Sequence, residues 1–559
     1  MYNCKNCGGA LEYDISLEKL HCAYCGTDYD PYQYDREEND NGVNEQQMFD
    51  VTVFTCPQCG GEITTTNLSA TGFCTYCGAN AVLTSRMGTA RRPEAIIPFQ
   101  KTKEDCRAAY EAFAKRAVYA PKEFRDPVYL DRFRGIYIPY WIYKVRFNDQ
   151  VTVKGTRSHR DGSYTVTDEY RLTCSVSGDY DGIPYDASSS FDDTIARMIA
   201  PYRAKSLRGF TPSILCGYYA DTADVASSVY DEDAVETAAN YAMRRVEKKL
   251  AKGGYTLDIP ALPEEKAKLL GAKKEGVTGA MLPVWFLTWR RNDRVAYAIV
   301  NGETGKVAAD LPVDMRRYLA GTAAMAVVLF LLFNFFLSMT APTALLISSV
   351  LALVSGILFY REMRKISSRE NHEEDKGFWA ADAAEGAGEN AAEAFRRSSA
   401  SKKAAAAHVK KFLNPLDSGS AFQRILRNTG GILAAAAFVF VQSGISELLD
   451  EVSPAQRALI GVIPTLAAGA VFFVLTIALA KRVKEKSMIP QAAAAFLAEL
   501  IAFVILALRP VDDWKYYAGS IACLAAVAVT CFGLIGKYNI LSTRPIPSFF
   551  DRKGGNDRA

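Results

Sequence analysis

Two copies of one cysteine motif open the chain, and no other feature constrains its fold as much. Each copy reads CxxC, then fourteen residues, then CxxC, and the second copy begins 52 residues after the first. A CxxC turn brings two thiolates within reach of one tetrahedral metal ion, and two such turns close a four-cysteine site. The motif therefore predicts two zinc ribbons, each holding one Zn²⁺, with these ligands: Cys4, Cys7, Cys22 and Cys25 in the first copy, and Cys56, Cys59, Cys74 and Cys77 in the second.

The residues that flank these cysteines repeat as well. Two glycines follow the first pair in both copies, and each second pair reads Cys-x-Tyr-Cys-Gly. Glycine reaches positive φ at that point, which lets backbone N–H groups point at sulfur. Two disulfides per copy are the alternative, and the spacing disfavours them. His21 beside Cys22 is a further donor, but the quartet is complete without it.

Beyond Tyr318 the chain carries apolar blocks, each about as long as the roughly 20 residues that cross a bilayer. Lysines and arginines flank alternate ends of these blocks, which favours two cytoplasmic termini. The blocks predict an all-α region of six transmembrane helices in a multi-pass protein of the inner (plasma) membrane, with the ribbons in a reducing compartment. The predicted spans are Leu319–Met339, Ala344–Tyr360, Thr429–Leu449, Ala458–Ala480, Ile489–Leu508 and Tyr517–Gly536.

The middle of the chain, residues 94–314, is long enough for a domain with its own core. Its apolar periodicity predicts a cytosolic α+β domain with a substantially antiparallel sheet. The Asn-Gly in the turn Asn301–Lys306 is a strong hairpin signal. The predicted helices are Lys103–Val118 and Val235–Leu250, and the predicted strands are Ile136–Tyr143, Gln150–Gly155, Thr165–Gly178 and the pair Leu282–Trp289 with Val295–Val300.

The predicted organisation is therefore multidomain, with two small zinc ribbons, an α+β domain and a helical membrane region. Its segments are ribbon 1 (1–30), an acidic linker (31–50), ribbon 2 (51–90), the cytosolic domain (94–314), a transmembrane hairpin (319–360), a cytosolic polar loop (361–428), four transmembrane helices (429–536) and a cytosolic tail (537–559).

Several stretches resemble a known family when they are taken with the cysteine motif. They read IPYWIY, GIPYDASSSFDD, PYRAKSLRGF, LPVW and NGETGK. The chain resembles a bacterial family of zinc-ribbon membrane proteins, often labelled TFIIB-type, over roughly residues 1–360. The resemblance implies ribbons, an α+β domain and membrane helices. It also implies a link to membrane-stress systems, with which some members are associated, and it implies no enzymatic activity.

Charge argues against nucleic acid as the partner of the ribbons. Residues 1–50 carry three basic against eleven acidic side chains, a net charge of −8, and residues 51–94 are close to neutral. Phosphate binding needs a basic footprint, which these segments lack. A basic protein partner fits better. Thirteen basic against ten acidic residues in 361–428 suggest contact with anionic membrane lipid, and a homo- or hetero-oligomer stays open.

Catalytic motifs are absent from the sequence, which predicts a protein that is not an enzyme. Its four histidines are scattered, and no GxSxG, Walker, HExxH or GxGxxG pattern has a supporting context. Asp192 and Asp193 fall in a run with Asp186 and Ser188–Ser190 that could bind a cation. A loop with a helix cap is the favoured interpretation of this run.

One carboxylate, Glu499, lies near the centre of the fifth predicted span. An acidic side chain there costs on the order of 3 kcal/mol, so it is commonly paired or functional. Passage of a proton or cation is one interpretation. A protonated carboxyl hydrogen-bonded to a neighbouring helix is the favoured one.

These features together predict a membrane-anchored zinc-ribbon scaffold or sensor that recruits a cytosolic or membrane protein partner. One alternative is a transporter or channel subunit that its zinc-ribbon head regulates. A metal- or redox-responsive switch is the other, and it requires a ribbon that releases its metal.

Overall fold

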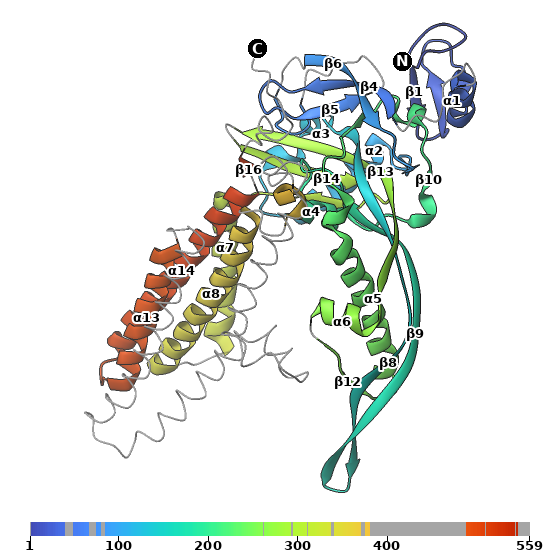
Figure 1. Ribbon diagram of the computed structural model, residues 1–559. Coiled ribbons are helices and arrows are strands. Elements are labelled where there is room, and N and C mark those ends of the chain that lie inside the picture. The colour runs from blue at the N-terminus through green and yellow to red at the C-terminus, as the bar shows by residue number, and fades with distance from the viewer. Residues whose placement is uncertain are drawn as a thin grey trace.

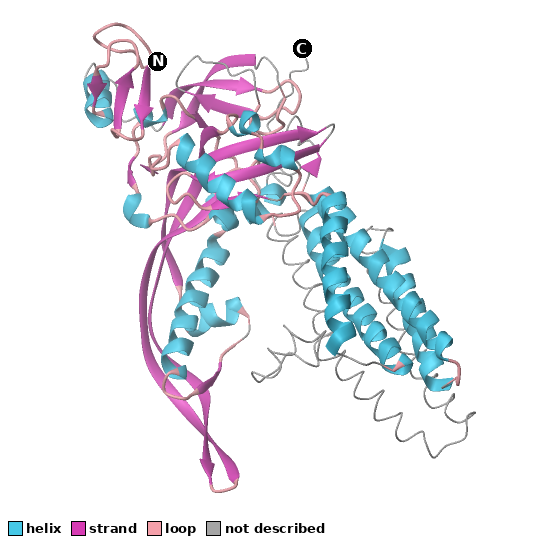
Figure 2. Ribbon diagram, turned by 180° about the vertical axis from the view of Figure 1, so that it is seen from behind, coloured by secondary structure: helices cyan, strands magenta, loops and turns pink. Residues whose placement is uncertain are grey.

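The computed structural model shows a sheet-rich head from which a long β-hairpin and a group of helices extend (Figure 1). The helices and the hairpin leave the head toward the same end of the molecule, as the two opposite views agree (Figure 2). The structure describes residues 2–39, 48–65, 74–79, 84–260, 262–291, 294–309, 311–336, 340–370, 375–380, 488–508, 510–542 and 544–545.

The first cysteine copy folds as a small unit at the edge of the head. Strands β1 (Leu11–Asp14), β2 (Lys19–Cys22) and β3 (Asp28–Tyr29) form a three-stranded antiparallel sheet. Helix α1 (Pro31–Asn39) follows at once and buries Tyr34 against the same core. The segment expected to be an acidic linker therefore begins with a helix. We call residues 2–39 the N-terminal unit.

A 13-stranded sheet forms the rest of the head and extends into the hairpin. Its order is β10-β7-β13-β8-β11-β5-β4-β6, with β9 and β12 on β8, and β14 on β13, β15 and β16. The second cysteine copy belongs to this sheet, because β5 pairs with β11 at Thr64 and Ala220. The strands are β4 (Met48–Thr55), β5 (Glu62–Thr65), β6 (Thr84–Arg91), β7 (Ala95–Ile96), β8 (Arg134–Asp161), β9 (Tyr164–Asp186), β10 (Arg208–Gly209), β11 (Tyr219–Ala220), β12 (Thr256–Asp258), β13 (Lys273–Arg291), β14 (Arg294–Asn301), β15 (Val307–Ala309) and β16 (Arg544–Pro545).

Strands β8 and β9 continue beyond the head as an antiparallel arm. Their register runs from Tyr140 opposite Asp186 to Asp161 opposite Tyr164, with one irregularity between Tyr143 and Lys144. Gly162 closes the tip at a positive φ of 59°. The predicted strands in this region are confirmed, although the two strands are much longer than the alternation suggested.

The predicted pairing between Leu282–Trp289 and Val295–Val300 is also confirmed. Val284 to Arg291 of β13 lie opposite Asn301 to Arg294 of β14. The Asn-Gly turn that follows joins β14 to β15, so it closes the next hairpin of the meander. The Asn-Gly signal for a hairpin was therefore correct, and the hairpin that it closes is formed by β14 and β15.

Helices cover both the head and the base of the arm. Helix α2 (Lys103–Arg116) starts with a capping box of Thr102 and Asp105 and buries Cys106 and Tyr110, which confirms the predicted helix. Val118, expected on the same apolar stripe, is 68% exposed because the helix ends before it. The other helices of the head are α3 (Pro127–Leu130), α4 (Asp193–Ile199), α5 (Asp231–Ala251) and α6 (Pro263–Leu269), and α5 confirms the second predicted helix.

In the part of the chain that the structure describes, four further helices lie outside the head. They are α7 (Met315–Phe336), α8 (Ala341–Glu370), α13 (Met488–Leu508) and α14 (Asp513–Leu541). Small side chains hold α8, α13 and α14 together, among them Ala352, Ala502 and Cys523, each with no exposed surface. Residues this small let helix backbones approach closely.

The predicted all-α region of six transmembrane helices is wrong. Within the described residues, one helix segment, Asp513–Ile540, is long and apolar enough to cross a membrane, with a mean hydropathy of 2.2. In α8 the apolar part ends at Gly356, and the charged residues that follow belong to the same helix. The predicted spans Thr429–Leu449 and Ala458–Ala480 lie outside the described residues.

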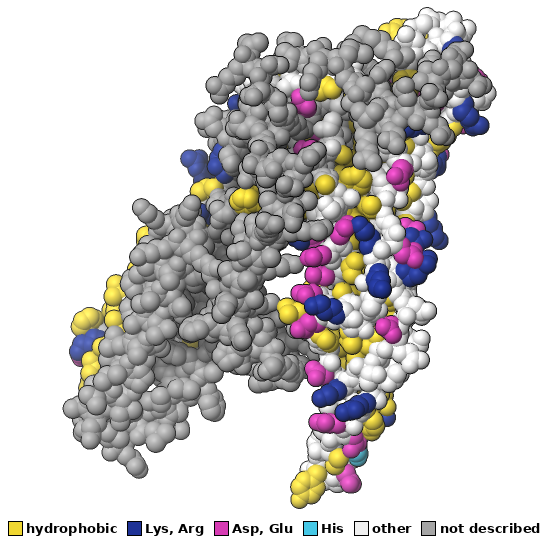
Figure 3. Space-filling model, in the orientation of Figure 1, with side chains coloured by type: hydrophobic (Ala, Val, Ile, Leu, Met, Phe, Trp, Pro, Cys, Tyr) yellow, Lys and Arg dark blue, Asp and Glu magenta, His cyan; other side chains and the backbone are white. Residues whose placement is uncertain are grey.

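The predicted location, a multi-pass protein of the inner membrane with both termini in the cytoplasm, is wrong on the same finding. The arm adds a physical reason. It extends toward the same end as the helices and carries exposed charged side chains, including Arg157, Arg160 and Glu169 (Figure 3). A bilayer around all the helices would meet this charged hairpin. The two cysteine clusters and the sheet-rich head stand as expected.

Candidate metal centres

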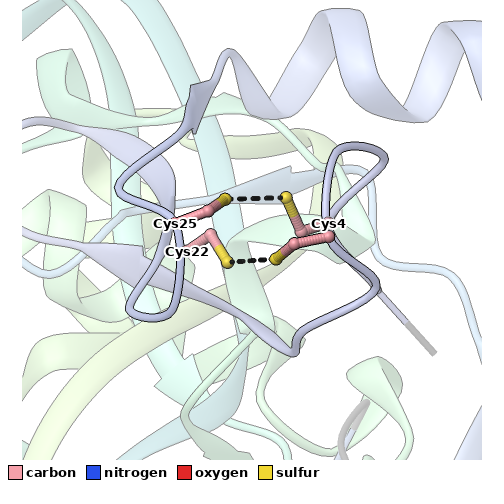
Figure 4. A group of neighbouring side chains, drawn as sticks. Cys4, Cys22 and Cys25 are labelled. Atoms are coloured by element: carbon pink, nitrogen blue, oxygen red, sulfur yellow. Dashed lines mark hydrogen bonds between the residues drawn. The ribbon is translucent and has the colours of Figure 1, made fainter.

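The first cysteine quartet brings its four thiols together in the N-terminal unit (Figure 4). The Sγ atoms of Cys4 and Cys25 are 3.5 Å apart, and those of Cys7 and Cys22 are 3.4 Å apart. Cys4 and Cys7 come from the turn before β1, whereas Cys22 ends β2 and Cys25 lies in the turn that follows. The small sheet therefore sets the two turns face to face.

The second quartet has the same arrangement within the main sheet. The Sγ atoms of Cys56 and Cys77 are 3.7 Å apart, and those of Cys59 and Cys74 are 3.8 Å apart. Four sulfurs at about 2.3 Å from one tetrahedral ion lie about 3.7–3.8 Å from one another. In each quartet all four sulfurs lie within 4.8 Å of each other, so each quartet could hold one metal ion.

All four CxxC turns share one backbone geometry. The N–H of a glycine donates to the carbonyl of the first cysteine of its turn at 2.8–2.9 Å, for Gly8, Gly26, Gly60 and Gly78. These four glycines have φ between 68° and 75°, which confirms the positive φ inferred from their repetition. In the second copy the Gly61 N–H also points at Cys59 Sγ, at 3.4 Å. Such N–H groups stabilise thiolate ligands.

The two quartets differ in their exposure to solvent. In the first, Cys7 and Cys25 are exposed, while Cys4 and Cys22 are buried. In the second, all four cysteines are buried. The second quartet packs against the central strands, where the Tyr297 hydroxyl donates to the Tyr76 carbonyl at 2.6 Å and Tyr76 lies against Phe286. One centre therefore faces solvent and the other is part of the core.

Hydrogen bonds to the first quartet change the acidity of its thiols. The Tyr29 hydroxyl, 3.3 Å from Cys4 Sγ, lowers the pKa of Cys4 to about 6. The Thr27 hydroxyl and backbone lower the pKa of Cys25. Both effects favour the thiolate, the form that binds metal. His21 is the alternative donor, and its Nδ1 atom lies 2.7 Å from Asp28 Oδ1. This hydrogen bond raises the pKa of His21.

A segment far along the chain anchors the N-terminal unit to the head. Buried Asp35 of α1 accepts hydrogen bonds from the Thr211 hydroxyl and from the Ser213 N–H, the latter at 3.1 Å. The Tyr13 N–H donates to the Cys216 carbonyl at 3.0 Å. Sequence reasoning missed this contact, because it joins residues 176 or more positions apart.

A surface feature of the N-terminal unit also escaped the sequence reasoning. Tyr24, between the ligands Cys22 and Cys25, is 81% exposed, and Leu17 on the preceding turn is 49% exposed. The Cys-x-Tyr-Cys-Gly repeat was a signal for Tyr24. Its counterpart Tyr76 is buried, so the two tyrosines serve different purposes.

The remaining predicted site residues are placed as follows. No disulfide joins any cysteine that the structure describes. Glu499 lies within α13, and its side chain is outside the described part of the structure. Asp192 caps α4, because its carboxylate accepts from the N–H groups of Thr194 and Ile195, which confirms the predicted helix cap.

Comparison with known proteins gives one informative relative. The chain is 25% identical over 329 residues to the uncharacterized protein YdjG of Bacillus subtilis (strain 168). The match covers 58% of this chain and 94% of the relative. No family model matches the sequence. No solved structure matches it either.

Proposed function

We propose that the chain is a zinc-ribbon scaffold that recruits a protein partner through its N-terminal unit. Zinc is the metal that fits the two quartets best, since four thiolates in tetrahedral arrangement favour Zn²⁺ or an iron–sulfur centre. Bound zinc would rigidify turns that are too short to fold by core burial alone. The quartets would then be structural, and the surface they hold would carry the function.

The exposure of Tyr24 is the observation that carries this proposal. An 81% exposed tyrosine on a turn fixed at both ends by metal ligands is an ordered, half-apolar contact residue. Tyrosine is enriched where protein interfaces concentrate their binding energy. The corresponding tyrosine of the second copy, Tyr76, is 3% exposed, which fits a division between one structural and one recruiting centre.

The charge around Tyr24 supports a basic partner. The first fifty residues have a net charge of −8, from three basic and eleven acidic side chains. Asp14 and Asp28 lie on the small sheet beside the exposed turn. Complementary charge would speed association and make it sensitive to salt.

Affinity capture with the tagged full-length chain tests the proposal, with bound proteins quantified by mass spectrometry. Tyr24→Ala should lose the partner and still bind about two zinc ions per chain, because no ligand is changed. Tyr164→Ala is the matched control, since Tyr164 is 78% exposed but lies at the far tip of the arm. Equal capture by Tyr24→Ala and the wild type would contradict recruitment through this unit.

A metal- or redox-responsive switch is the second candidate, and the exposure of Cys7 and Cys25 favours it. Solvent-accessible thiolates are the ones that oxidants reach. Under limiting hydrogen peroxide, the chain should release about one zinc ion well before the other, and Cys4→Ser/Cys7→Ser should lack the early release. Simultaneous release of both ions would argue against this function.

A further inference from the structure

Three carboxyl groups are buried near one another in the head, and two of them, Asp186 and Asp193, are in direct contact. Asp186 ends β9, Asp193 begins α4, and Asp375 begins the short segment 375–380. They are 1%, 6% and 5% exposed. Asp186 and Asp193 interact directly through their side chains, and the charge of Asp375 acts on both. Neighbouring carboxyl groups in a buried site do not all stay ionised unless a cation, a bound proton or hydrogen-bond donors compensate their negative charge.

Asp193 has its hydrogen-bond partners, which fix its position. The Tyr230 hydroxyl donates to Asp193 Oδ1 at 2.8 Å, and the Lys376 N–H donates to Asp193 Oδ2 at 2.8 Å. Segment 375–380 therefore closes over the carboxyl groups. Within the segment, the Phe378 N–H donates to Asp375 Oδ1 at 2.9 Å.

Asp186 is the exception, and it is the observation that points to a ligand. Within the described residues, no N–H or hydroxyl group donates to its Oδ2 atom, and the side-chain contact of this carboxyl is the Asp193 carboxyl, although Asp186 is only 1% exposed. The hydroxyl of Tyr140, directly opposite Asp186 in the sheet, is likewise buried without a described partner. Buried polar atoms are nearly always satisfied, so two such atoms beside a carboxyl pair call for an explanation.

Two basic side chains lie near this cluster, Lys376 and Arg197, and neither is described as an ion-pair partner of Asp186 or Asp193. Lys376 forms an ion pair with Asp233, and the Arg197 Nε donates to the backbone carbonyl of Asp193 at 3.2 Å. The neighbouring carboxylates Asp221 and Asp224 accept hydrogen bonds from the hydroxyls of Ser188 and Ser189.

We propose that Asp186 and Asp193, closed over by Asp375, bind a divalent cation that prefers hard oxygen ligands. Carboxylate and hydroxyl oxygens are the donors that Ca²⁺, Mg²⁺ and Mn²⁺ take. The cation would satisfy Asp186 Oδ2 and balance the buried charge. It would also tie segment 375–380 to the ends of β9 and α4.

The competing explanation is a proton shared between Asp186 and Asp193. Burial raises the pKa of Asp186 well above its ordinary value, and that of Asp193 is raised for the same reason. A cation and this proton compete for the same oxygens, so the affinity for the cation must increase with pH. A proton alone would leave the protein indifferent to added cations.

Titration of the zinc-loaded full-length chain with Mn²⁺, followed by electron paramagnetic resonance, tests the proposal. We expect about one high-affinity Mn²⁺ per chain, weakened at least about tenfold by Asp186→Asn, as loss of a metal-site partner typically does. Asp179→Asn is the matched control, because it removes an exposed carboxylate from the same strand and should leave the affinity unchanged.

Hydrogen exchange supplies a second measurement, in which each protein is compared with itself with and without the cation. Ca²⁺ or Mg²⁺ should slow exchange of the Lys376 amide in the wild type and not in Asp186→Asn. Equal Mn²⁺ affinity for the wild type and Asp186→Asn would overturn the proposal. Failure of millimolar Ca²⁺ and Mg²⁺ to change either exchange or thermal stability would also overturn it and assign the site to a shared proton.

Discussion

At the scale of single residues, four glycines close the CxxC turns with nearly the same φ but in different surroundings. An added Cβ at Gly8 would meet nothing within 4 Å. At Gly78 it would lie 3.2 Å from Thr288 Cγ2 and 3.2 Å from Arg290 Cβ. Both positions therefore require a positive φ, but only Gly78 also lacks room for a side chain.

This difference predicts two sizes of effect. Gly8→Ala should destabilise its zinc centre by about 1–2 kcal/mol, the cost of a left-handed L-residue. Gly78→Ala should cost more, because strand β13 must also give way. The urea midpoint for zinc release from each centre, followed with a chromogenic chelator, measures both. A smaller effect at Gly78 than at Gly8 would show that the packing at β13 is not a constraint.

Asp186 predicts that the free energy of unfolding depends on pH. The measurement is made without added divalent cations, in buffer that was passed over a chelating resin before the protein was added. Its raised pKa means that the folded chain holds a proton that the unfolded chain has lost above pH about 4. The stabilisation is therefore complete at low pH and declines as the pH rises through the raised pKa. Above pH about 5, where an ordinary aspartate is ionised, Asp186→Asn should flatten the decline in unfolding free energy, and Asp179→Asn should not.

Both cysteine quartets could be predicted residue by residue, because CxxC spacing reports the geometry of one tetrahedral ion. The cap at Asp192 was predictable for the same kind of reason, since its partners are two and three residues away. It was not predictable that no N–H or hydroxyl group would donate to Asp186 Oδ2. It depends on β9, α4 and segment 375–380 meeting in space, and no local pattern reports that meeting.

At the scale of elements, α1 is what attaches the N-terminal unit to the head. Asp35 is 7% exposed and accepts two hydrogen bonds from the segment 211–213. The helix also places Tyr32, whose hydroxyl donates to the Gly209 carbonyl at 3.1 Å. One face of a nine-residue helix therefore holds the unit in place.

Asp35→Ala should loosen this attachment by about 1–3 kcal/mol, because it leaves the buried Ser213 N–H without its acceptor. Exchange of the Ser213 amide with deuterium should become faster, while zinc content stays the same. Glu37→Gln on the same helix is the control, since its ion pair with Lys5 is exposed and screened by solvent. Unchanged exchange in Asp35→Ala would mean that other contacts hold the unit.

The elements were predictable wherever periodicity was local. Helices α2 and α5 and the pairing of β13 with β14 followed from apolar spacing. The full length of β8 did not, because its last residues, Arg157–Asp161, are all exposed and lack the alternation of a half-buried strand. The role of α1 was missed because its burying contacts lie far away along the chain.

At the scale of the whole molecule, the two cysteine centres contribute differently to the stability of the fold. The second belongs to the same core as Ile138, Leu282 and Phe286 of the central strands. The first packs at the margin of another core that includes Phe210 and Ile214. Loss of one metal should therefore affect far more of the protein than loss of the other.

Paired variants test this inequality. Cys59→Ser/Cys74→Ser should abolish cooperative thermal unfolding of the head, because it leaves unmatched polar groups in the central core. Cys4→Ser/Cys7→Ser should leave most of the near-ultraviolet circular dichroism of the head intact and remove about one zinc ion. Comparable losses in both variants would show that the centres are equivalent for folding.

The helical part shows where composition misled the sequence analysis. Apolar blocks of about 20 residues are shared by membrane spans and by helices that pack on one another, and only length, continuity and surroundings separate them. Helix α8 runs from an apolar half into a charged one without a break. That continuity could not be inferred from a count of apolar residues.

The arm that continues past the irregularity at Tyr143 and Lys144 has a mechanical property. Beyond this irregularity, strand β12 pairs with β8 as far as Thr156, and helix α5 packs on Val145, Phe147 and Val153. The inner part of the arm is therefore braced against the head, and only the last residues before the tip project alone among the described residues. From Ser158 to Asp161 this free end extends about 13 Å at about 3.3 Å per residue. A rotation of about 10° at its base would displace Tyr164 by only about 2–3 Å, so the arm is a stiff projection whose direction is set by the head.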